Sequence, residues 1–256
     1  MTTVREATLD VLRHFGMTRM FSNPGSTEVA FLAHLPADFE FVLGLHEASV
    51  VGMATGVALA AGQPALVLLH TTAGLGNAVG AIATARVNRA PLVVVVGQQD
   101  RRHLALEPFL AGPLDGLAGE YPVWRTQPIS AQNVPGAIAR AWHEANRGRG
   151  PALVIVPMDD WLAEAVDEPL AAPVAPLGRS LPDPAAVSAV ASAIADAERP
   201  AIVVGAGTDT AEGWAGVVAL AERLDCSVWM EPFGQRVGFP QDHRLSPDSS
   251  RPIVPG

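Results

Sequence analysis

The sequence is short of several residue types, and each shortage excludes a class of protein. It has one cysteine, Cys226, so neither a disulfide framework nor a zinc site built from cysteines can form within one chain. It has no lysine, which excludes a phosphate-binding Walker loop. No apolar run approaches the roughly 20 residues of a membrane span. The N-terminus lacks the basic and apolar blocks of a signal peptide, so we expect a cytoplasmic protein.

The composition also limits the partners. A formal net charge of −9 argues against binding to nucleic acid or to anionic membranes. Apolar residues make up 49% of the 256 positions, enough for a substantial core. This length allows one large or two modest domains.

The first two thirds of the chain alternate between apolar runs of strand length and segments with helical patterning. Strands that are apolar throughout and alternate with helices indicate a parallel sheet covered on both faces, so we predict an α/β, doubly wound, mostly parallel fold. The segment 104–128 shows no pattern. The predicted strands are 19–22, 40–44, 65–69, 92–96 and 152–156, and the predicted helices are 3–15, 27–35, 48–61, 78 to about 88, and 131–146.

In a sheet of this kind the strand-to-helix loops gather at the carboxyl ends of the strands, where ligands bind. Ser26, Glu47 and His70 each follow a predicted strand closely. The pattern therefore predicts that these three side chains, distant in sequence, converge at one edge.

Glu47 is the most informative of the three. It stands between a strand predicted to be buried, 41–44, and a helix of small residues, 48–61, and His46 is the one nearby side chain able to pair with it. A carboxylate in such apolar surroundings commonly has a partner from outside the protein or a raised pKa. The alternative is an acid that only stabilises the start of a helix.

The neighbouring polar residues also have structural interpretations. Ser26 is a candidate helix N-cap, and His70 is a candidate buried histidine bonded to a backbone carbonyl. The glycines of Gly74-Leu-Gly-Asn-Ala-Val-Gly80 lack the spacing of a dinucleotide fingerprint, so NAD binding is not expected. We interpret them as room for a flat ligand or a neighbouring subunit.

Beyond the first region we predict a linker, 167–184, where proline is frequent and apolar periodicity is lost. A second domain, 185–256, would contain helices 185–197 and 213–224 and strands 201–204 and 227–230. One βαβ unit cannot bury both faces of its sheet. We therefore expect either a fragment of a longer protein or dependence on a partner.

Five motifs together resemble the N-terminal part of the thiamine-diphosphate-dependent decarboxylases, and within them the benzoylformate decarboxylase branch. The resemblance runs from about residue 5 to about residue 239. It is carried by Phe21-Ser-Asn-Pro-Gly-Ser26, Leu45-His-Glu-Ala-Ser49, Leu69-His-Thr-Thr-Ala-Gly-Leu-Gly-Asn77, Pro91-Leu-Val-Val-Val-Val-Gly-Gln-Gln99 and Val156-Pro-Met-Asp-Asp-Trp161.

The resemblance implies three domains, of which two are represented here: a pyrimidine-binding domain over 1–166 and an incomplete, Rossmann-like central domain over 185–256. The family's diphosphate-binding domain, which would hold Mg²⁺, is missing, so we expect no metal ligands here and no activity from this chain alone. The cofactor of this family lies between subunits. A homodimer, a homotetramer or a separate diphosphate-binding subunit is therefore implied.

The resemblance also implies roles for individual residues. Glu47 would hydrogen-bond the pyrimidine ring nitrogen of thiamine diphosphate, Ser26 would hold the substrate, and His70 would orient it and transfer protons. Leu110 would line the substrate pocket together with Ser26 and His70. The implied cofactor-binding residues are Asn23, Pro24, Gly25, Glu47, Gly74 and Asn77.

The reaction so implied is decarboxylation of a 2-oxo acid, and the benzoylformate branch implies an aromatic one. Two alternatives stay open. The chain could be a non-catalytic partner or regulatory subunit of a split thiamine-diphosphate enzyme. It could also serve a carboligase or lyase that uses the same cofactor.

Overall fold

The structure, a computed structural model, describes residues 2–166, 181–232 and 236–247. The chain divides into two compact units, Met1–Ala175 and Pro176–Gly256. Most of the predicted linker, residues 167–180, lies outside the described residues.

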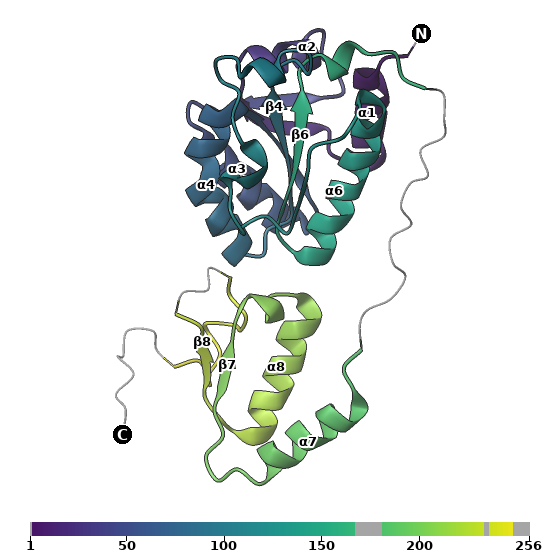
Figure 1. Cartoon of the computed structure of the whole chain (residues 1–256). Coiled ribbons are helices and arrows are strands. Elements are labelled where there is room, and N and C mark those ends of the chain that lie inside the picture. The colour runs from purple at the N-terminus through teal and green to yellow at the C-terminus, as the bar shows by residue number, and fades with distance from the viewer. Residues whose placement is uncertain (1, 167–180, 233–235, 248–256) are drawn as a thin grey trace. The chain divides into compact units, whose positions relative to one another are not determined.

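The first unit contains one sheet of six parallel strands in the order β2-β1-β3-β4-β6-β5 (Figure 1). The sheet and its flanking helices confirm the predicted α/β fold. The strands are β1 (Arg19–Asn23), β2 (Glu40–Leu43), β3 (Ala65–His70), β4 (Leu92–Gln98), β5 (Trp124–Thr126) and β6 (Pro151–Pro157).

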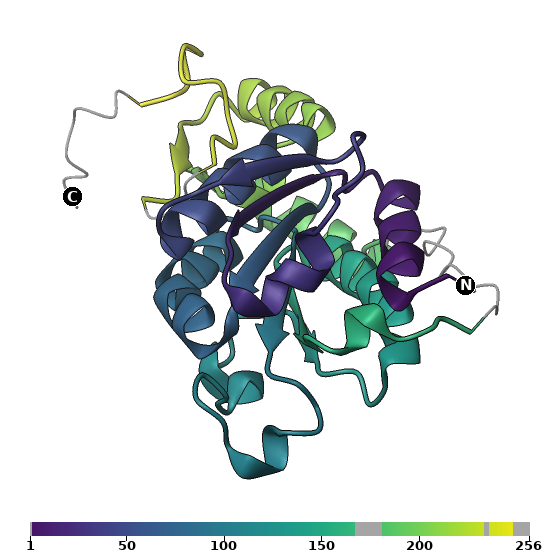
Figure 2. The same cartoon turned by 90° about the horizontal axis from the view of Figure 1, so that it is seen from above.

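Helices cover both faces of this sheet (Figures 1 and 2). One face packs against α1 and α6, and the other packs against α3, α4 and α5. The helical segments of this unit are α1 (Val4–His14), η1 (Ser26–Glu28), α2 (Val29–Leu32), α3 (Glu47–Ala61), α4 (Thr71–Val87), η2 (Leu104–Leu106), α5 (Leu114–Leu117), η3 (Ala131–Asn133), α6 (Val134–Gly148) and η4 (Asp160–Leu162).

The central strands are buried along their length because both sides of the sheet are covered. In β3, Leu66 and Leu68 belong to the core shared with α1 and α6, whereas Val67 and Leu69 belong to the core shared with α3 and α4. Side chains alternate across a strand, so an unbroken apolar run fills both layers. This is why the sequence of β3 shows no polar alternation.

The order of the strands creates a switch point beside β1. The chain leaves β1 through η1 and α2, which contributes Phe31 to the α1–α6 core, and forms β2 on one side of β1. It then crosses the opposite face through α3 and forms β3 on the other side of β1. Crevices at such points, outside the carboxyl ends of the strands, are the usual ligand sites of open α/β sheets.

The prediction that the strand residues 41–44 are buried is wrong. Among the described strands β2 lies at the edge of the sheet, next to β1. Phe41 and Leu43 are 37% and 56% exposed. An apolar run does not by itself distinguish a central strand from an edge strand, because it carries no information about the order of the strands.

The predicted helix 27–35 is shorter than expected. It consists of one 3-10 turn, η1, followed by the four residues of α2. The backbone becomes extended at Ala33, and His34 has a positive φ of 51°. Arg5 donates hydrogen bonds to the carbonyl oxygens of Phe31 and Ala33 at 2.7 and 2.5 Å, which satisfies carbonyls that a longer helix would have used.

Two other boundaries differ from the prediction. The helix expected to begin near residue 78 begins at Thr71, directly after β3, so the glycine-rich stretch 74–80 lies inside the helix. β5 lies inside the segment 104–128, which showed no pattern. Its three residues are only half-buried, so they carry no apolar signal.

In the second unit the predicted order of elements is confirmed. Two parallel strands, β7 and β8, pair along Ile202–Val204 and Val228–Met230. A small core of Val204, Ala221, Val228 and Phe239 packs beneath them. The remaining elements are α7 (Pro184–Ala195), η5 (Ala206–Thr208) and α8 (Ala211–Leu224).

Across both units, none of the described helices combines the length and the apolar character that crossing a membrane requires.

Candidate active site

Glu47 is the first residue of α3 and lies at the carboxyl edge of the sheet. Its side chain is 7% exposed. The sequence suggested His46 as the one nearby partner of Glu47. Instead, His46 caps α3, because its Nδ1 accepts a hydrogen bond from the Ala48 N–H at 3.1 Å. The idea that His46 pairs with Glu47 is therefore wrong.

The partners of Glu47 come from two other elements. Asn23 at the end of β1 donates through Nδ2 to Oε1 at 3.0 Å. Asn77 on α4 donates through Nδ2 to Oε2 at 3.1 Å. The sequence placed both asparagines beside the ligand, but it did not indicate that they hold the carboxylate.

This arrangement fixes Glu47 without neutralising it. The two amides are uncharged, and no ion pair with Glu47 is found within the described part of the chain. Each carboxylate oxygen has two lone pairs, so each can accept one more hydrogen bond. Glu47 is therefore held in place and shielded from solvent, and it can still accept a hydrogen bond from a ligand.

His70 ends β3 and lies beside the turn that follows β1. Its Nδ1 is 2.9 Å from Thr27 Oγ1 and 3.1 Å from Glu28 Oε2. The alternative that His70 is bonded to a backbone carbonyl is not what the structure shows. Gly25 packs directly against the imidazole, because a Cβ at residue 25 would lie 2.5 Å from three of the ring atoms.

The backbone is strained immediately after His70. Thr71 has a φ of 42°, which is rare for a β-branched residue. Such conformations cost about 1–3 kcal/mol and concentrate at functional sites. The Thr71 side chain is fully buried, and in the described part of the chain its Oγ1 has no hydrogen-bond partner.

Ser26 is the first residue of η1, and its side chain is exposed. It is not the N-cap that the sequence suggested, because Gly25 occupies that position. Ser26 directly follows the glycine that contacts His70, and Pro24 before it is also exposed. The turn after β1 therefore lies against the end of β3.

Gly74 connects the Glu47 and His70 regions. A Cβ at this residue would lie 3.6 Å from Glu47 Cγ and 3.5 Å from His70 Cβ. Leu110 reaches the same region through its backbone, since its carbonyl oxygen accepts from Thr72 Oγ1 at 3.3 Å, two residues after His70. The structure thus brings the predicted site residues between Asn23 and Asn77 together near the carboxyl ends of β1 and β3, and Leu110 adjoins them through its backbone.

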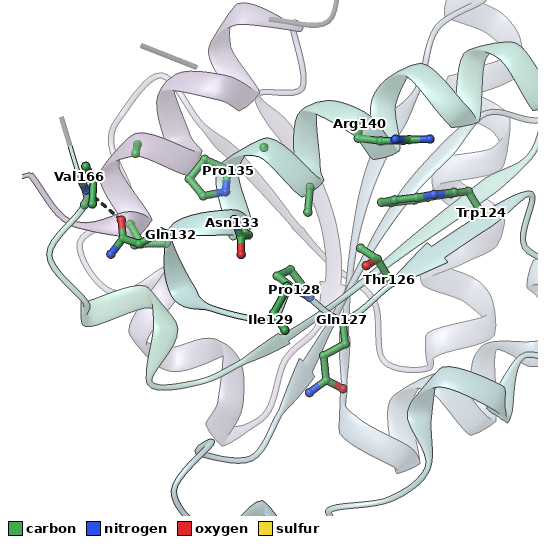
Figure 3. Close-up of a pocket in the computed structure, with 15 residues that line it drawn as sticks. Trp124, Thr126, Gln127, Pro128, Ile129, Gln132, Asn133, Pro135, Arg140 and Val166 are labelled. Carbon is green, nitrogen blue, oxygen red and sulfur yellow. Dashed lines mark hydrogen bonds between the residues drawn. The ribbon is translucent and has the colours of Figure 1, made fainter. Parts of the chain in front are cut away.

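A cavity of about 620 Å³ lies elsewhere in this unit, between β5, the start of α6 and the N-terminal turn of α1 (Figure 3). Trp124 and Arg140 form one wall, with the guanidinium 5.8 Å from the ring centroid. Arg140 also pairs with Glu144. None of the predicted site residues lines this cavity.

The sequence missed three residues that surround His70: Thr27, Glu28 and Gly97. Glu28 stands three residues after Gly25, the spacing of a capping box, and its Oε2 accepts from the Gly25 N–H at 2.8 Å. That spacing was the available signal for Glu28. The approach of Gly97 depends on the pairing of β4 with β3; its signal in the sequence is a glycine at the end of an apolar run, which does not say what approaches it.

Comparison with known proteins identifies the family. Residues 2–118 match the N-terminal TPP binding domain of the thiamine pyrophosphate enzymes, and residues 187–249 match the central domain of the same enzymes. The chain belongs to the thiamine pyrophosphate enzyme family.

Particular relatives share most of this chain. It is 41% identical over 250 residues to benzoylformate decarboxylase from Pseudomonas aeruginosa, which covers 95% of this chain and 47% of that protein. It is 30% identical to sulfoacetaldehyde acetyltransferase from Rhodobacter capsulatus, over 95% of this chain and 41% of that protein.

Among solved structures, benzoylformate decarboxylase from Polynucleobacter necessarius superimposes with a TM-score of 0.90 at 39% identity, over 96% of this chain and 46% of that one. A thiamine diphosphate-dependent 4-hydroxybenzoylformate decarboxylase from Rhodococcus jostii gives a TM-score of 0.87 at 38% identity, over 94% of this chain and 46% of that one. The chain spans about half the length of the relatives it matches.

Proposed function

We propose that this chain supplies the pyrimidine-binding part of a thiamine-diphosphate-dependent decarboxylase that acts on an aromatic 2-oxo acid. The observation that carries the proposal is the state of Glu47: buried, held by the amides of Asn23 and Asn77, and free of any ion pair in the described residues. The higher identity to a benzoylformate decarboxylase, 41%, than to an acetyltransferase, 30%, supports decarboxylation over carboligation.

The residues present fit an aminopyrimidine ring. Gly74 lacks a Cβ that would press against Glu47 Cγ at 3.6 Å, and each oxygen of Glu47 keeps a lone pair for a hydrogen on the ring. Bound thiamine diphosphate supplies an electron sink for loss of carbon dioxide from a 2-oxo acid. Glu47 would share a proton with the pyrimidine ring nitrogen through a hydrogen bond. The residues around the ring would be Asn23, Pro24, Gly25, Gly74 and Asn77.

The substrate would lie on the His70 side of this site. Ser26, exposed next to Gly25, would bind the substrate carboxylate, and His70 would orient the substrate and transfer a proton. Leu110 would contribute to an apolar wall. The same loop carries Leu106 and Phe109, which are 78% and 88% exposed, as expected for side chains that an aryl group could cover.

The same proposal includes assembly with further protein. Helices α3 and α4 are apolar around most of their circumference, yet one side of each is exposed. On that side Gly52, Gly56, Gly76 and Gly80 have open space above their Cα atoms. A helix without a polar face normally has a partner on every side. We propose a homodimer or homotetramer, or a complex with a diphosphate-binding subunit that carries Mg²⁺.

Three further expectations from the sequence belong to this proposal. They are the domain division into 1–166 and 185–256, the intervening linker, and the cytoplasmic location.

Binding to the isolated chain is the first test. Thiamine diphosphate, or its aminopyrimidine fragment without the diphosphate, is titrated into the ¹⁵N-labelled chain and into Glu47→Gln. We expect shifts of the Asn23 and Asn77 side-chain amides in the wild type and at least tenfold weaker binding in the variant. Equal binding by the two proteins would contradict the proposed role of Glu47.

Turnover is the second test. We expect no aldehyde from this chain alone with thiamine diphosphate, Mg²⁺ and benzoylformate. In a complex reconstituted with a diphosphate-binding polypeptide, Glu47→Gln is expected to lower kcat by a factor of about 10² to 10⁴. Unchanged turnover in that complex would instead indicate a non-catalytic partner subunit.

A further inference from the structure

The unassigned residue with the most specific surroundings is Glu28. Its side chain is buried, at 4% exposure, on the single 3-10 turn that follows β1. Oε2 accepts from the Gly25 N–H at 2.8 Å and lies 3.1 Å from His70 Nδ1, while Oε1 accepts from the Thr27 hydroxyl at 2.5 Å. A buried carboxylate needs donors on both oxygens, and here it has them.

We infer that Glu28 is a positioning residue that holds His70 in the Nδ1–H tautomer, with the lone pair on Nε2. Nothing in the proposed function assigns Glu28 a role. The effect of Glu28 on turnover rests on the proposed function, because the protonation of Nε2 matters only if a substrate binds beside His70. The tautomer itself is a property of this chain alone.

Counting hydrogens decides the tautomer. Thr27 has one hydroxyl hydrogen, and the ionised carboxylate of Glu28 has none. If the hydroxyl donates to Glu28 Oε1, then Nδ1–H donates to both Glu28 Oε2 and Thr27 Oγ1, and every close pair has one hydrogen. If the hydroxyl donated to Nδ1 instead, Nδ1 would carry a lone pair. The contact between Nδ1 and Glu28 Oε2 would then have no hydrogen, and neither would the contact between Thr27 Oγ1 and Glu28 Oε1. With an ionised Glu28, only the first of these two arrangements satisfies the group.

The space for this arrangement comes from the strand next to β3. Gly97 on β4 is the register partner of His70. A Cβ at Gly97 would overlap both Glu28 Oε1 and Thr27 Oγ1. The missing side chain therefore lets the Glu28 carboxylate reach in beside His70, and this explains a glycine inside an otherwise apolar central strand.

The chemical consequence concerns Nε2. In the described part of the chain it has no hydrogen-bond partner, and the side chain of His70 is 17% exposed. A neutral imidazole with its lone pair on Nε2 can take a proton there. Glu28 would then stabilise the imidazolium through Nδ1, the function of a buried carboxylate behind a catalytic histidine.

The test reads the tautomer directly by ¹⁵N NMR of the histidine-labelled full chain, without cofactor. The His70→Asn variant identifies the His70 signals by their loss. We expect a pyrrole-type Nδ1 and a pyridine-type Nε2 at neutral pH. A wild-type His70 with the proton on Nε2 would overturn the inference.

Two matched variants separate Glu28 from its neighbour. Glu28→Met keeps the volume and removes the acceptors. In this variant we expect a pyridine-type Nδ1 and a pyrrole-type Nε2, because free histidine prefers the Nε2–H tautomer. Thr27→Val keeps the shape and leaves Glu28 in place, and it is expected to retain Nδ1–H. An unchanged tautomer in a folded Glu28→Met would also overturn the inference.

If Glu28→Met fails to fold, the wild type and Thr27→Val still decide the question. Failure of the proposed function is distinguishable as well. It would appear as absence of thiamine diphosphate binding, with the His70 signals as expected.

Discussion

The imidazole of His70 lies against Gly25 so closely that a Cβ on Gly25 would fall 2.5 Å from Cγ, Cδ2 and Nδ1 of the ring. The turn after β1 can therefore pack against the end of β3 only because residue 25 has no side chain. This contact connects the Ser26 turn to the histidine and gives the first prediction.

Gly25→Ala should displace either the His70 ring or the turn. Because Thr27 and Glu28 hold the ring at Nδ1, it cannot move away freely, and we expect a loss of about 1–3 kcal/mol in the free energy of unfolding, as for overpacked cores. Urea denaturation of the isolated chain measures it.

The matched control is Gly56→Ala on α3, where the added methyl meets open space. It should stabilise the chain by up to about 1 kcal/mol through helix propensity. Equal effects of the two substitutions would show that the contact with His70 does not matter.

The second prediction concerns the amide that holds Glu47. Asn77→Ala removes one of its two donors, so we expect a loss of about 1–3 kcal/mol in stability. Asn77→Asp should be worse, because it places a second carboxylate about 3 Å from the first, and the deficit should shrink as the pH is lowered. Unfolding midpoints at neutral and acid pH test the ranking. If Asn77→Asp were as stable as the wild type at neutral pH, Glu47 would not be held as described.

A third prediction contrasts a buried ion pair with an exposed one. Arg101 donates to both oxygens of Asp160, each at 2.7 Å, and Asp160 is 2% exposed. Arg101→Ala leaves that carboxylate buried and unpaired, so we expect a loss of about 3–5 kcal/mol.

The comparison is Arg19→Ala, which breaks the pair with Glu40 at the surface. Exposed pairs contribute about 0–1 kcal/mol. Thermal unfolding of the two variants side by side gives the difference. A small effect of Arg101→Ala would mean that Asp160 gains another donor or becomes protonated.

The fourth prediction is a pH dependence. Hydrogen bonds from the side chain and the backbone N–H of Arg102 hold the pKa of Asp100 well below its usual range. A carboxyl whose pKa is lowered on folding stabilises the fold above its unfolded pKa, about 3.9, and this stabilisation is lost as the pH falls toward the folded value. Asp100→Asn should therefore be less stable than the wild type at pH 7, and the difference should fade below about pH 4. A difference that grew toward acid pH would contradict the assignment.

Much of the fold could be predicted because its strongest signals are local. The runs at β3, β4 and β6 are apolar throughout since both faces of a parallel sheet are covered, and this made the fold class readable. Strand order is not local. The same apolar character in Phe41 and Leu43 suggested burial, but β2 lies at the edge, and β5 was too short and too polar to be predicted.

The site shows the same division. The prediction that loops after the strands converge brought Ser26, Glu47 and His70 to one edge. The partners of those residues come from pairings across the fold, so sequence neighbours were a poor guide: His46 caps a helix, while Asn23 and Asn77 hold Glu47. The sequence did not predict Glu28 as a site residue, because its partner His70 lies 42 residues away along the chain.

The described contacts around Glu47 and His70 all fall within one continuous stretch of chain, from Asn23 to the Gly112 carbonyl that accepts from Gln98. In the described residues β5, α6 and β6 supply no hydrogen-bonding side chain to Glu47 or His70, although Leu153 and Ile155 of β6 pack in the core beside β3 and β4. A chimera that replaced everything after Gly112 with the corresponding segment of a relative would keep each of these contacts, provided that the new β6 still paired with β4.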